Sequence, residues 1–426
     1  MQVCIRTNDT ALGPHTDETY ELEVTKGTAS VASANSVYGL LHALESFSQV
    51  VDELGGGFVV ENTPLRIEDE PRFSYRGLLI DTGRHFLPVD TIKRAIDGLH
   101  MNRMNVLHWH IVDSQSFPCG SDTFPQLAEK GAFSEKAIYS TSEMRDIVAY
   151  GKSRGVRVMP EWDIPGHGSW GAGMPEIMGC DIVLDPTNAT TYDFLNAFFE
   201  EMMTIFEDEY VFLGGDEVDY TCWDANPKIA EWLKANGMNS SQLQQYFWAQ
   251  VRERVLPASL AGRTISIWEN DVLQIDPMDL PNGTVANVYQ SKATADRTIG
   301  TYRMPSVLSI AGDNWYLDSQ CSGYNWNSWK CRYTVEPTSN LTKQKHLLPL
   351  LLGGEGAMWG EGINKDNFDA YVWHGTAAIA ERLWSPADLT QSADDASPRL
   401  SEQMCRMSAR GFRPGPIGPG YCPGDL

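Results

Sequence analysis

The chain has 426 residues, a hydrophobic fraction of 42% and a formal net charge of −23 at pH 7. This length allows one large domain with a small one, or two mid-sized domains, and the hydrophobic fraction is typical of a globular protein with a sizeable core. The strong negative charge argues against nucleic acid and anionic membranes as partners, because both would repel the chain.

The first 70 residues predict a small α/β unit. Tyr20 to Val24 alternates apolar and polar residues as a half-buried strand does, and Val37 to Val51 carries apolar residues at helical spacing. A polar, proline-containing link from Asn62 to Pro71 separates this unit from the rest of the chain. Because so short a segment cannot bury a large core alone, we expect an accessory domain over residues 1–70 that leans on the larger remainder of the protein.

From Phe73 onward, short apolar strands alternate with helical stretches. One helix is expected over Met144–Lys152, because Ser140 and Glu143 form a capping-box pattern before it and Gly155 follows it. Eight strands alternating with helices predict an α/β fold, a (β/α)8 TIM barrel over residues 71–426, with an open α/β sheet as the alternative. The strand candidates are Arg76–Asp81, Asn105–Asp113, Val156–Asp163, Tyr210–Glu217, Thr264–Asn270, Thr284–Tyr289, Ser306–Asp313 and Leu348–Gly354. Two further helices with strong apolar periodicity are expected over Thr191–Phe206 and Phe368–Leu383.

Almost every strand candidate ends in an acid, a histidine or an aromatic residue. In a barrel these ends converge on one rim, which is where the active sites of this fold lie. Any one of these residues alone could be a solvated loop residue, but burying so many charges costs stability unless they are paired or functional. The residues are Asp81, Asp113, Glu161, Asp163, Asp216, Glu217, Glu269, Tyr289, Asp313 with Trp315, and Trp359 with Glu361 just past the eighth strand.

Carboxyl groups mixed with Trp and Tyr favour a carbohydrate ligand, because aromatic faces pack on sugar C–H faces and carboxylates accept hydroxyl hydrogen bonds. Glycoside hydrolysis usually needs two carboxyl groups. Asp216 and Glu217 are adjacent, and on a regular strand their side chains would point to opposite faces. Only an irregular strand end lets both face one sugar, and such a pair suits a substrate-assisted reaction in which the sugar's own acetamido oxygen attacks. Trp232, Trp248 and Trp373 lie in helical patterns and are interpreted as core packing.

Several motifs together resemble those of the family 20 β-hexosaminidases, in family order from about residue 20 to the C-terminus. The most specific is Leu213-Gly214-Gly215-Asp216-Glu217-Val218, followed by Cys222-Trp223. The others are Arg76-Gly77-Leu78-Leu79-Ile80-Asp81-Thr82 with Arg84-His85-Phe86, Asn105-Val106-Leu107-His108-Trp109-His110 with Asp113, Pro165-Gly166-His167, Trp315-Tyr316-Leu317-Asp318, and Gly353-Gly354-Glu355 with Met358-Trp359-Gly360-Glu361. The resemblance implies a retaining, exo-acting β-N-acetylhexosaminidase that needs neither cofactor nor metal.

The resemblance also implies a role for each matching residue. Glu217 would be the general acid and base, Asp216 would hold the acetamido nitrogen, and Tyr316 would bind the acetamido oxygen. Asp113 and His167 would support proton transfer by Glu217, whose pKa we expect neighbouring Asp216 to raise. The substrate-binding residues implied are Trp268, Tyr289 and Trp359 around the acetamido group, Trp315 beside them, and Arg84, Asp318 and Glu361 on the ring hydroxyls.

Some positions depart from the common family pattern. Phe212 stands where a histidine is frequent, Ser114 replaces the second of two aspartates, Gly83 replaces a serine, and Tyr289 occupies a cage position that is frequently Trp. None of these changes removes a proposed catalytic group. The resemblance further implies a Cys180–Cys222 disulfide, an accessory domain shorter than that of relatives, and a homodimer, because dimers are common in the family.

Two other functions compete with a hydrolase of this family. His108 and His110 lie two apart on a strand and face the same way, as metal ligands in amidohydrolase-like enzymes do. The later strand ends offer acids and aromatics instead of further histidines, so two hydrogen-bonded barrel histidines are the favoured interpretation. A non-catalytic sugar-binding protein on the same scaffold is the second alternative, although Glu217 and Tyr316 are both present.

The compartment is indicated by sequons and cysteines. Eight cysteines, an even number, fit disulfide pairing in an oxidising compartment, and none forms an array typical of structural zinc. Met1 to Asp9 lacks the pattern of a signal peptide. The sequence contains no uncharged apolar run of about eighteen residues, so a transmembrane helix is not expected. We therefore expect a secreted protein, or one of the lysosomal or vacuolar lumen, whose leader has been removed. The sequons begin at Asn8, Asn188, Asn239, Asn282 and Asn340, and spacing suggests the pairs Cys321–Cys331 and Cys405–Cys422.

Overall fold

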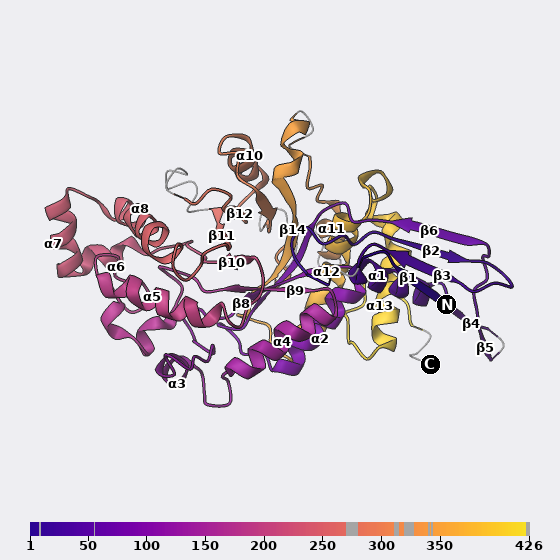
Figure 1. Cartoon of the computed structure of the whole chain (residues 1–426), viewed down its shortest axis with the longest axis horizontal. Coiled ribbons are helices and arrows are strands. Elements are labelled where there is room, and N and C mark those ends of the chain that lie inside the picture. Colours follow the sequence, from indigo (N-terminus) through magenta and orange to yellow (C-terminus); the bar gives the residue numbers. More distant parts are fainter. Residues whose placement is uncertain are drawn as a thin grey trace.

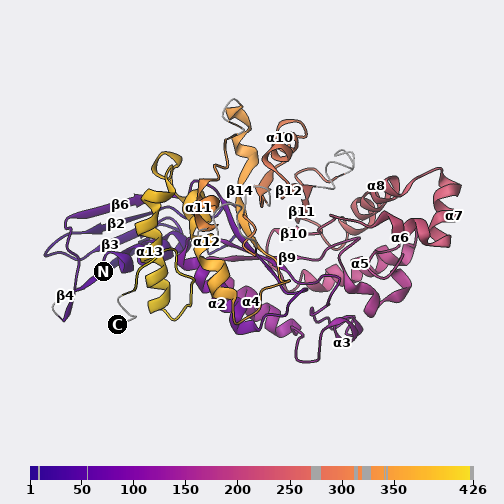
Figure 2. The ribbon, with the colours of Figure 1, turned by 180° about the vertical axis from the view of Figure 1, so that it is seen from behind.

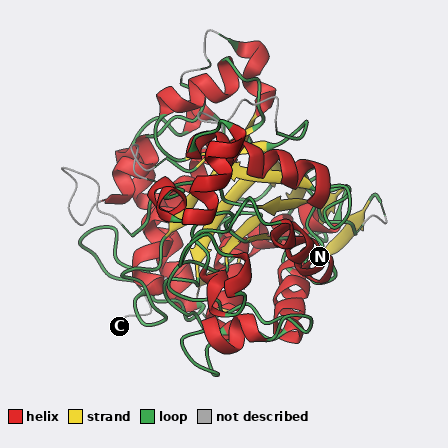
Figure 3. Ribbon diagram, turned by 90° about the vertical axis from the view of Figure 1, so that its left-hand side faces the viewer, coloured by secondary structure: helices red, strands yellow, loops and turns green. Residues whose placement is uncertain are grey.

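The computed structural model describes residues 1–426 except 8–9, 55, 270–279, 311–314, 319–327, 340, 342–343 and 423–426. It consists of a closed barrel of eight parallel strands and, at one end of the molecule, a separate four-stranded sheet near the N-terminus (Figure 1). Seen end-on, helices surround the strands of the barrel (Figure 3). Within the described ranges, no helix is both long and apolar enough to cross a lipid bilayer.

The N-terminal sheet has the strand order β1-β3-β2-β6. Strand β2 (Tyr20–Val24), expected from its alternating pattern, pairs antiparallel with both β3 (Val31–Ala34) and β6 (Leu65–Asp69). The expected link over residues 62–71 is wrong at this point, because it contains β6. Its residues alternate apolar and polar, so Leu65 and Ile67 pack on the core of the sheet. The sheet is completed by β1 (Gln2–Ile5), with the hairpin β4 (Asp52–Leu54) and β5 (Gly57–Val59) beside it.

The core of this sheet depends on the barrel. Helix α1 (Val37–Gln49) contributes Leu40, and Trp384 from the end of the last barrel helix packs into the same cluster. A buried ion pair adds to this junction, with Arg76 Nη2 at 2.6 Å from Glu18 Oε1. The view from behind shows α13 in front of the N-terminal unit (Figure 2), and Arg410, just past α13, lies 2.9 Å from Glu45 of α1. The small unit therefore leans on the rest of the chain, as its length predicts.

The barrel closes by parallel pairing between its last strand, β14, and its first, β7. This closure confirms the predicted (β/α)8 barrel over the open sheet, and all eight strand candidates form strands. Several differ in extent. The second strand stops at His110, the fourth at Phe212 instead of continuing to Glu217, and the seventh at Leu308, while residues 345–350 form a 3-10 helix before the eighth. The strands are β7 (Tyr75–Asp81), β8 (Val106–His110), β9 (Arg157–Glu161), β10 (Tyr210–Phe212), β11 (Thr264–Trp268), β12 (Val285–Val288), β13 (Ser306–Leu308) and β14 (Leu351–Met358).

Helices cover the outside of the barrel and bury its outer core. The capping box of Ser140 and Glu143 is present, and Gly155 has a φ of 72° just past the helix end, as expected. The helix predicted over Thr191–Phe206 ends earlier, at Met202. The helices are α2 (Val89–Met101), α3 (Gln126–Gly131), α4 (Thr141–Ser153), α5 (Ala189–Met202), α6 (Tyr220–Ala225), α7 (Pro227–Asn236), α8 (Ser240–Gln250), α10 (Lys292–Gly300), α11 (Ser328–Thr334), α12 (Phe368–Trp384) and α13 (Ala393–Ala409). Shorter turns are η1 (Ser169–Ala172), η2 (Pro175–Ile177), η3 (Val251–Val255), η6 (Lys345–Leu350) and η7 (Ala387–Leu389).

A second, smaller core fills the interior of the barrel. Its apolar members come from alternate positions of the strands, as the two-residue period of a strand requires. Tyr289, Tyr316 and Trp359 pack against it and are only partly buried. The aromatic residues predicted from the strand ends therefore stand above an apolar floor formed by Tyr75, Leu79, Val106, Met159, Tyr210, Phe212, Trp268, Val285, Val307 and Ala357.

Candidate functional site

The chain leaves the regular strand before it reaches the two adjacent carboxyls. After β10, Gly214 and Gly215 have φ angles of 68° and 100°, and Glu217 has a φ of 54°. A side chain at Gly214 would place its Cβ 2.0 Å from the Asp163 carboxylate, so this turn requires glycine. The strand end is irregular, which is the condition under which both carboxyls can face one ligand.

Both carboxyls lie beside His167. Glu217 Oε2 is 3.5 Å from His167 Nε2, and one oxygen of Asp216 lies within 4.8 Å of a ligand atom of the same imidazole. On its other side, His167 Nδ1 is 3.5 Å from Asp113 Oδ1, and Asp113 Oδ2 is 2.8 Å from His110 Nε2. The residues predicted to act as acid, base and proton relay are thus brought together. His110, Asp113, His167 and Glu217 form one continuous file of contacts.

The charges in this file differ from the expectation for Glu217. The His167 imidazole, 3.5 Å away, lowers the pKa of Glu217, and the side chain of Glu217 is 62% exposed. The prediction of a raised pKa for Glu217 is therefore wrong, because the cations of His167 and Arg84 outweigh burial and the charge of Asp113. Burial instead raises the pKa of Asp216, to which the charge of Glu217 adds. For His167, burial lowers the pKa, but the carboxylates of Asp113 and Glu217, each 3.5 Å away, raise it to about 12.

Asp163 is a further member of the site, named from the sequence only as a strand-end acid. It is 1% exposed and accepts the Gly215 N–H at 2.8 Å. Burial and the charge of Asp216 raise the pKa of Asp163 well above its ordinary value. Ligand atoms of Asp163, His167 and Asp216 lie within 4.8 Å of one another, the one arrangement among the described residues close enough to hold a metal ion.

Aromatic side chains pack on one another and form a wall against the inner core of the barrel. The Trp268 ring lies 5.6 Å from that of Tyr289 at an interplanar angle of 79°, and 5.9 Å from that of Trp359. Tyr316 continues the wall, 6.0 Å from Trp359. The charge of Asp216 contributes to raising the pKa of both tyrosines, after burial, which places the wall and the carboxyl around one space.

Arg84 occupies the polar side of the rim. Its guanidinium lies 3.2 Å from Asp81, 2.9 Å from Asp113 and 3.3 Å from Glu361, and it stacks 4.9 Å over the ring of Trp359. The Glu361 side chain is 63% exposed and so remains accessible to a ligand. Burial raises the pKa of Asp318, and the charge of Glu361 adds to this effect, so the two acids share a region.

Two strand-end residues have positions that differ from the predicted rim. Trp315 is 0% exposed in the outer core, where its indole N–H donates to the Arg332 carbonyl at 3.1 Å, so the structure does not bring it to the group around Tyr316. Glu269 is also buried, and its carboxylate accepts the backbone N–H of Gln290 at 3.1 Å and that of Tyr289. Burial raises the pKa of Glu269 to about 7. Asp313, named from the sequence as a strand end, lies outside the described residues.

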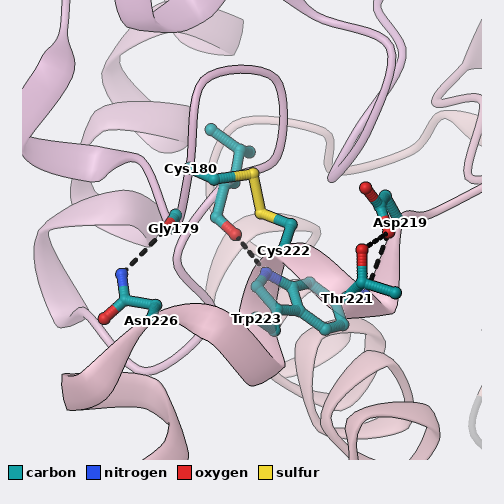
Figure 4. Close-up of a disulfide and its surroundings, with 8 residues drawn as sticks. Gly179, Cys180, Asp219, Thr221, Cys222, Trp223 and Asn226 are labelled. Atoms are coloured by element: carbon teal, nitrogen blue, oxygen red, sulfur yellow. Dashed lines mark hydrogen bonds between the residues drawn. A yellow bond between two sulfur atoms is a disulfide. The ribbon is translucent and has the colours of Figure 1, made fainter.

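A disulfide supports the segment that carries Glu217. Cys180 and Cys222 are bonded, as the family resemblance implies, and join the loop before α5 to helix α6 (Figure 4). Beside it, Trp223 donates its indole N–H to the Leu184 carbonyl at 2.9 Å, and Asn226 donates to the Gly179 carbonyl at 2.7 Å. Cys405–Cys422 is also formed, Cys4 and Cys119 are free, and Cys321 lies outside the described residues, as do Asn8 and Asn340.

Removing the disulfide with Cys180→Ala and Cys222→Ala should lower the free energy of unfolding by about 2–4 kcal/mol, because the closed loop constrains the unfolded chain. The two cysteines are 42 residues apart. Removing the disulfide should also lower kcat, because it anchors α6, which begins three residues after Glu217. Urea unfolding and steady-state kinetics measure the two effects. The matched control, Cys405→Ala with Cys422→Ala, removes a disulfide that closes a shorter loop far from the site, and it should reduce stability alone. Equal kcat losses for the two pairs of substitutions would contradict the prediction.

Comparison with known proteins shows which family the chain matches. Residues 73–387 match the family described as "Glycosyl hydrolase family 20, catalytic domain", and residues 1–50 match "beta-acetyl hexosaminidase like". The chain is 39% identical over 425 residues to the beta-hexosaminidase subunit beta of Homo sapiens, covering 95% of this chain and 73% of that subunit. Identity to the same subunit of Mus musculus is 39% over 424 residues, covering 95% and 76%. Among solved structures, the chitobiase of Flavobacterium johnsoniae superposes with a TM-score of 0.84 at 32% identity, covering 96% of this chain and 62% of the chitobiase.

Proposed function

Because the chain belongs to glycosyl hydrolase family 20, whose β-hexosaminidases hydrolyse N-acetylhexosamine, we propose that it removes terminal, β-linked N-acetylhexosamine from the non-reducing ends of glycans or chitooligosaccharides, with retention of configuration. The observation that carries this proposal is the irregular end of β10, which sets Asp216 and Glu217 beside one imidazole, while the charge of Asp216 also acts on Tyr289 and Tyr316 of the aromatic wall. Two adjacent carboxyls cannot flank a bond as separate acid and nucleophile, so the substrate itself supplies the nucleophile.

In the first step, the acetamido carbonyl oxygen attacks the anomeric carbon and Glu217 protonates the departing oxygen. Asp216 accepts the acetamido N–H, and its negative charge stabilises the cationic oxazolinium ring that forms. Tyr316 donates its hydroxyl to the acetamido oxygen, while Trp268, Tyr289 and Trp359 surround the acetamido methyl group. In the second step, Glu217 takes a proton from water, which opens the ring from the face that the leaving group vacated.

The proton for the first step is stored in the pair formed by His167 and Glu217. In the free protein the pair is an imidazolium beside a carboxylate, since the pKa of His167 is raised and that of Glu217 is lowered. A bound sugar covers the exposed Glu217 carboxylate, and this loss of solvation favours the protonated carboxyl. The proton then passes from His167 to Glu217, so Glu217 is protonated only when substrate is bound.

Specificity for a terminal sugar is assigned to the polar side of the rim. Arg84, Asp318 and Glu361 bind the ring hydroxyls, and Arg84 is oriented for this by Asp81 and Asp113 behind it. The two disulfides formed between described residues support a secreted protein or one of the lysosomal or vacuolar lumen. Assembly as a homodimer stays a prediction.

The proposed function is tested by release of a chromophore from an aryl β-N-acetylglucosaminide. We expect turnover that is insensitive to a chelator and absent for the corresponding β-glucoside, which lacks the acetamido nucleophile. Binding of the sugar without turnover would favour the non-catalytic sugar-binding alternative. Loss of turnover in chelator, restored by a divalent metal, would favour a metal-dependent hydrolase using Asp163, His167 and Asp216.

The pH dependence should change sharply in His167→Gln. Without the imidazolium, the pKa of Glu217 returns to the ordinary carboxyl range near 4.5, and its proton is lost as pH rises through that value. The alkaline limb of kcat/KM should therefore move down to about pH 4–5, giving a loss of about a hundredfold at pH 7. Profiles of kcat/KM against pH measure this shift. The control His100→Gln changes a half-buried histidine in α2 that binds the Arg154 carbonyl, and should keep the wild-type profile; an unmoved alkaline limb in His167→Gln would contradict the proton-storing pair.

A further inference from the structure

Glu161, the last residue of β9, is 0% exposed and uses its two carboxylate oxygens for different partners. Its Oε1 accepts the indole N–H of Trp268 at 2.9 Å. Its Oε2 lies 2.9 Å from His108 Nε2 and 2.7 Å from His110 Nδ1. A barrel interior packs equally well with apolar side chains, and a buried carboxylate is costly even when it is paired. Its contacts therefore call for a role beyond packing.

The contact with His110 connects Glu161 to the acid and base. His110 Nε2 lies 2.8 Å from Asp113, which in turn contacts His167, the partner of Glu217. Because both nitrogens of His110 face a carboxylate, its ring cannot turn without losing one of them. Glu161 thereby fixes the orientation of Asp113 and, through Asp113, that of His167.

The contact with Trp268 connects the same carboxylate to the aromatic wall. Trp268 has a single N–H, and it is donated to Glu161. Its other side-chain contacts are with ring faces and edges, those of Phe212, His108, Tyr289 and Trp359. Ring contacts of this kind tolerate rotation far better than a hydrogen bond does. The plane of the indole that faces the ligand is therefore set by Glu161.

Glu161 keeps its charge and so holds geometry without exchanging the catalytic proton. Burial raises its pKa, but the charges of His110 and His108 lower it to about 2. Burial lowers the pKa of His108, and the charges of Glu355 and Glu161 raise it to about 9. The ring of Phe212, the residue that departs from the family pattern, stacks on His108 at 4.4 Å and closes this array on the side of the barrel core.

We propose that Glu161 is a positioning residue whose single carboxylate aligns both halves of the site, the file that ends at Glu217 and the aromatic wall that holds the acetamido group. This inference rests on the proposed function. It predicts that the two halves can be disturbed separately by choosing which oxygen contacts survive at position 161.

The test compares Glu161→Gln with Glu161→Leu. Glutamine keeps an oxygen for Trp268 but loses the charge between the two histidines. With an aryl β-N-acetylglucosaminide of a weakly acidic phenol, its kcat should fall about 30-fold to 100-fold, and with a strongly acidic phenol much less, because that leaving group needs little acid. Binding of a thiazoline mimic of the intermediate should stay within about threefold. Leucine removes the oxygen as well, so the mimic should then bind about tenfold more weakly than to Glu161→Gln, the effect of one lost hydrogen bond.

Glu355→Gln is the matched control. Glu355 is also 0% exposed and lies 3.2 Å from the other nitrogen of His108, but it contacts neither His110 nor Trp268 among the described contacts. The control should keep the wild-type ratio between the two phenols and the wild-type affinity for the mimic. The same changes in Glu355→Gln as in Glu161→Gln would overturn the inference, as would an unchanged phenol ratio in Glu161→Gln or equal mimic binding by the glutamine and leucine variants.

Glu161→Asp guards against a variant that does not fold, since it keeps the buried charge. Its carboxylate is drawn back by about 1.5 Å, one C–C bond, so it cannot reach all of its partners at once. Both readouts should lie between those of the wild type and Glu161→Leu, and wild-type values would overturn the inference. Turnover by the wild type is measured first: its absence overturns the proposed function together with this inference, whereas wild-type turnover with an unaffected Glu161→Gln overturns the inference alone.

Discussion

Glu217→Gln should lower kcat for an aryl β-N-acetylglucosaminide with a weakly acidic phenol by about a thousandfold, with little change in KM. The amide cannot donate a proton to the departing oxygen, and a general acid contributes about 10²-fold to 10⁴-fold to such a step. The substrate-binding residues on the rim are left in place, which is why binding is preserved. Steady-state kinetics at the pH of maximal wild-type activity measure the loss.

Two comparisons sharpen this prediction. A strongly acidic phenol should recover much of the first step in Glu217→Gln, because its departure needs little proton transfer. Glu176→Gln, the same substitution at an exposed glutamate in η2, should behave as the wild type. A loss that is equal for both phenols, or smaller than tenfold for the weaker one, would remove Glu217 from the role of general acid.

Asp216→Asn should lower kcat by about a hundredfold to a thousandfold, the usual effect of deleting one electrostatic contact to a transition state. Asparagine removes the negative charge that faces the oxazolinium ring. It should also abolish the acid limb of kcat/KM. In the wild type, burial raises the pKa of Asp216, so activity is lost as pH falls through that raised pKa; asparagine has no such proton to gain.

The stability of Asp216→Asn should move in the opposite direction. A carboxyl whose pKa is raised by folding costs the folded state free energy once pH exceeds its ordinary value, because the charge is buried. The neutral amide removes this cost, so the Tm at pH 7 should be equal to or above that of the wild type. Lost activity together with a retained Tm separates a functional carboxylate from a structural one, and a lower Tm with unchanged kcat would reverse the assignment.

The fold could be predicted from the sequence because the apolar strands are short, repeated and separated by well-marked helices. The ends of the strands could not. The two glycines mark a break, but the sequence does not show that β10 already stops at Phe212, since the irregular turn depends on the Asp163 carboxylate, which follows β9. Strand β6 escapes prediction for a related reason: its apolar residues are few, and its pairing partner lies some forty residues earlier.

The candidate site could be predicted mainly through motifs, which identify residues but give no distances. The motifs identify the residues of the file and the aromatic wall, and the structure brings most of them together. They place Trp315 beside Tyr316, yet adjacent residues of an extended segment face opposite ways, and Trp315 lies in the outer core. The direction of the Glu217 pKa depends on an imidazole fifty residues away in sequence. Glu161 and Asp163 stand out only as strand-end acids, because their partners come from β8, β11 and the turn after β10.

The position of Trp384 has a consequence for how the protein is made. This residue ends α12, near the close of the chain, and completes the core that Leu22 and Leu40 begin. During synthesis from the N-terminus, the first sheet must therefore wait, with its apolar face uncovered, until almost the whole barrel has emerged. The barrel has the same constraint, since β7 gains its neighbour β14 only after about 270 residues have been added. The N-terminal sheet and the barrel are thus both completed only when β14 and α12 have been added. Until then the nascent chain exposes the apolar surface that chaperones bind.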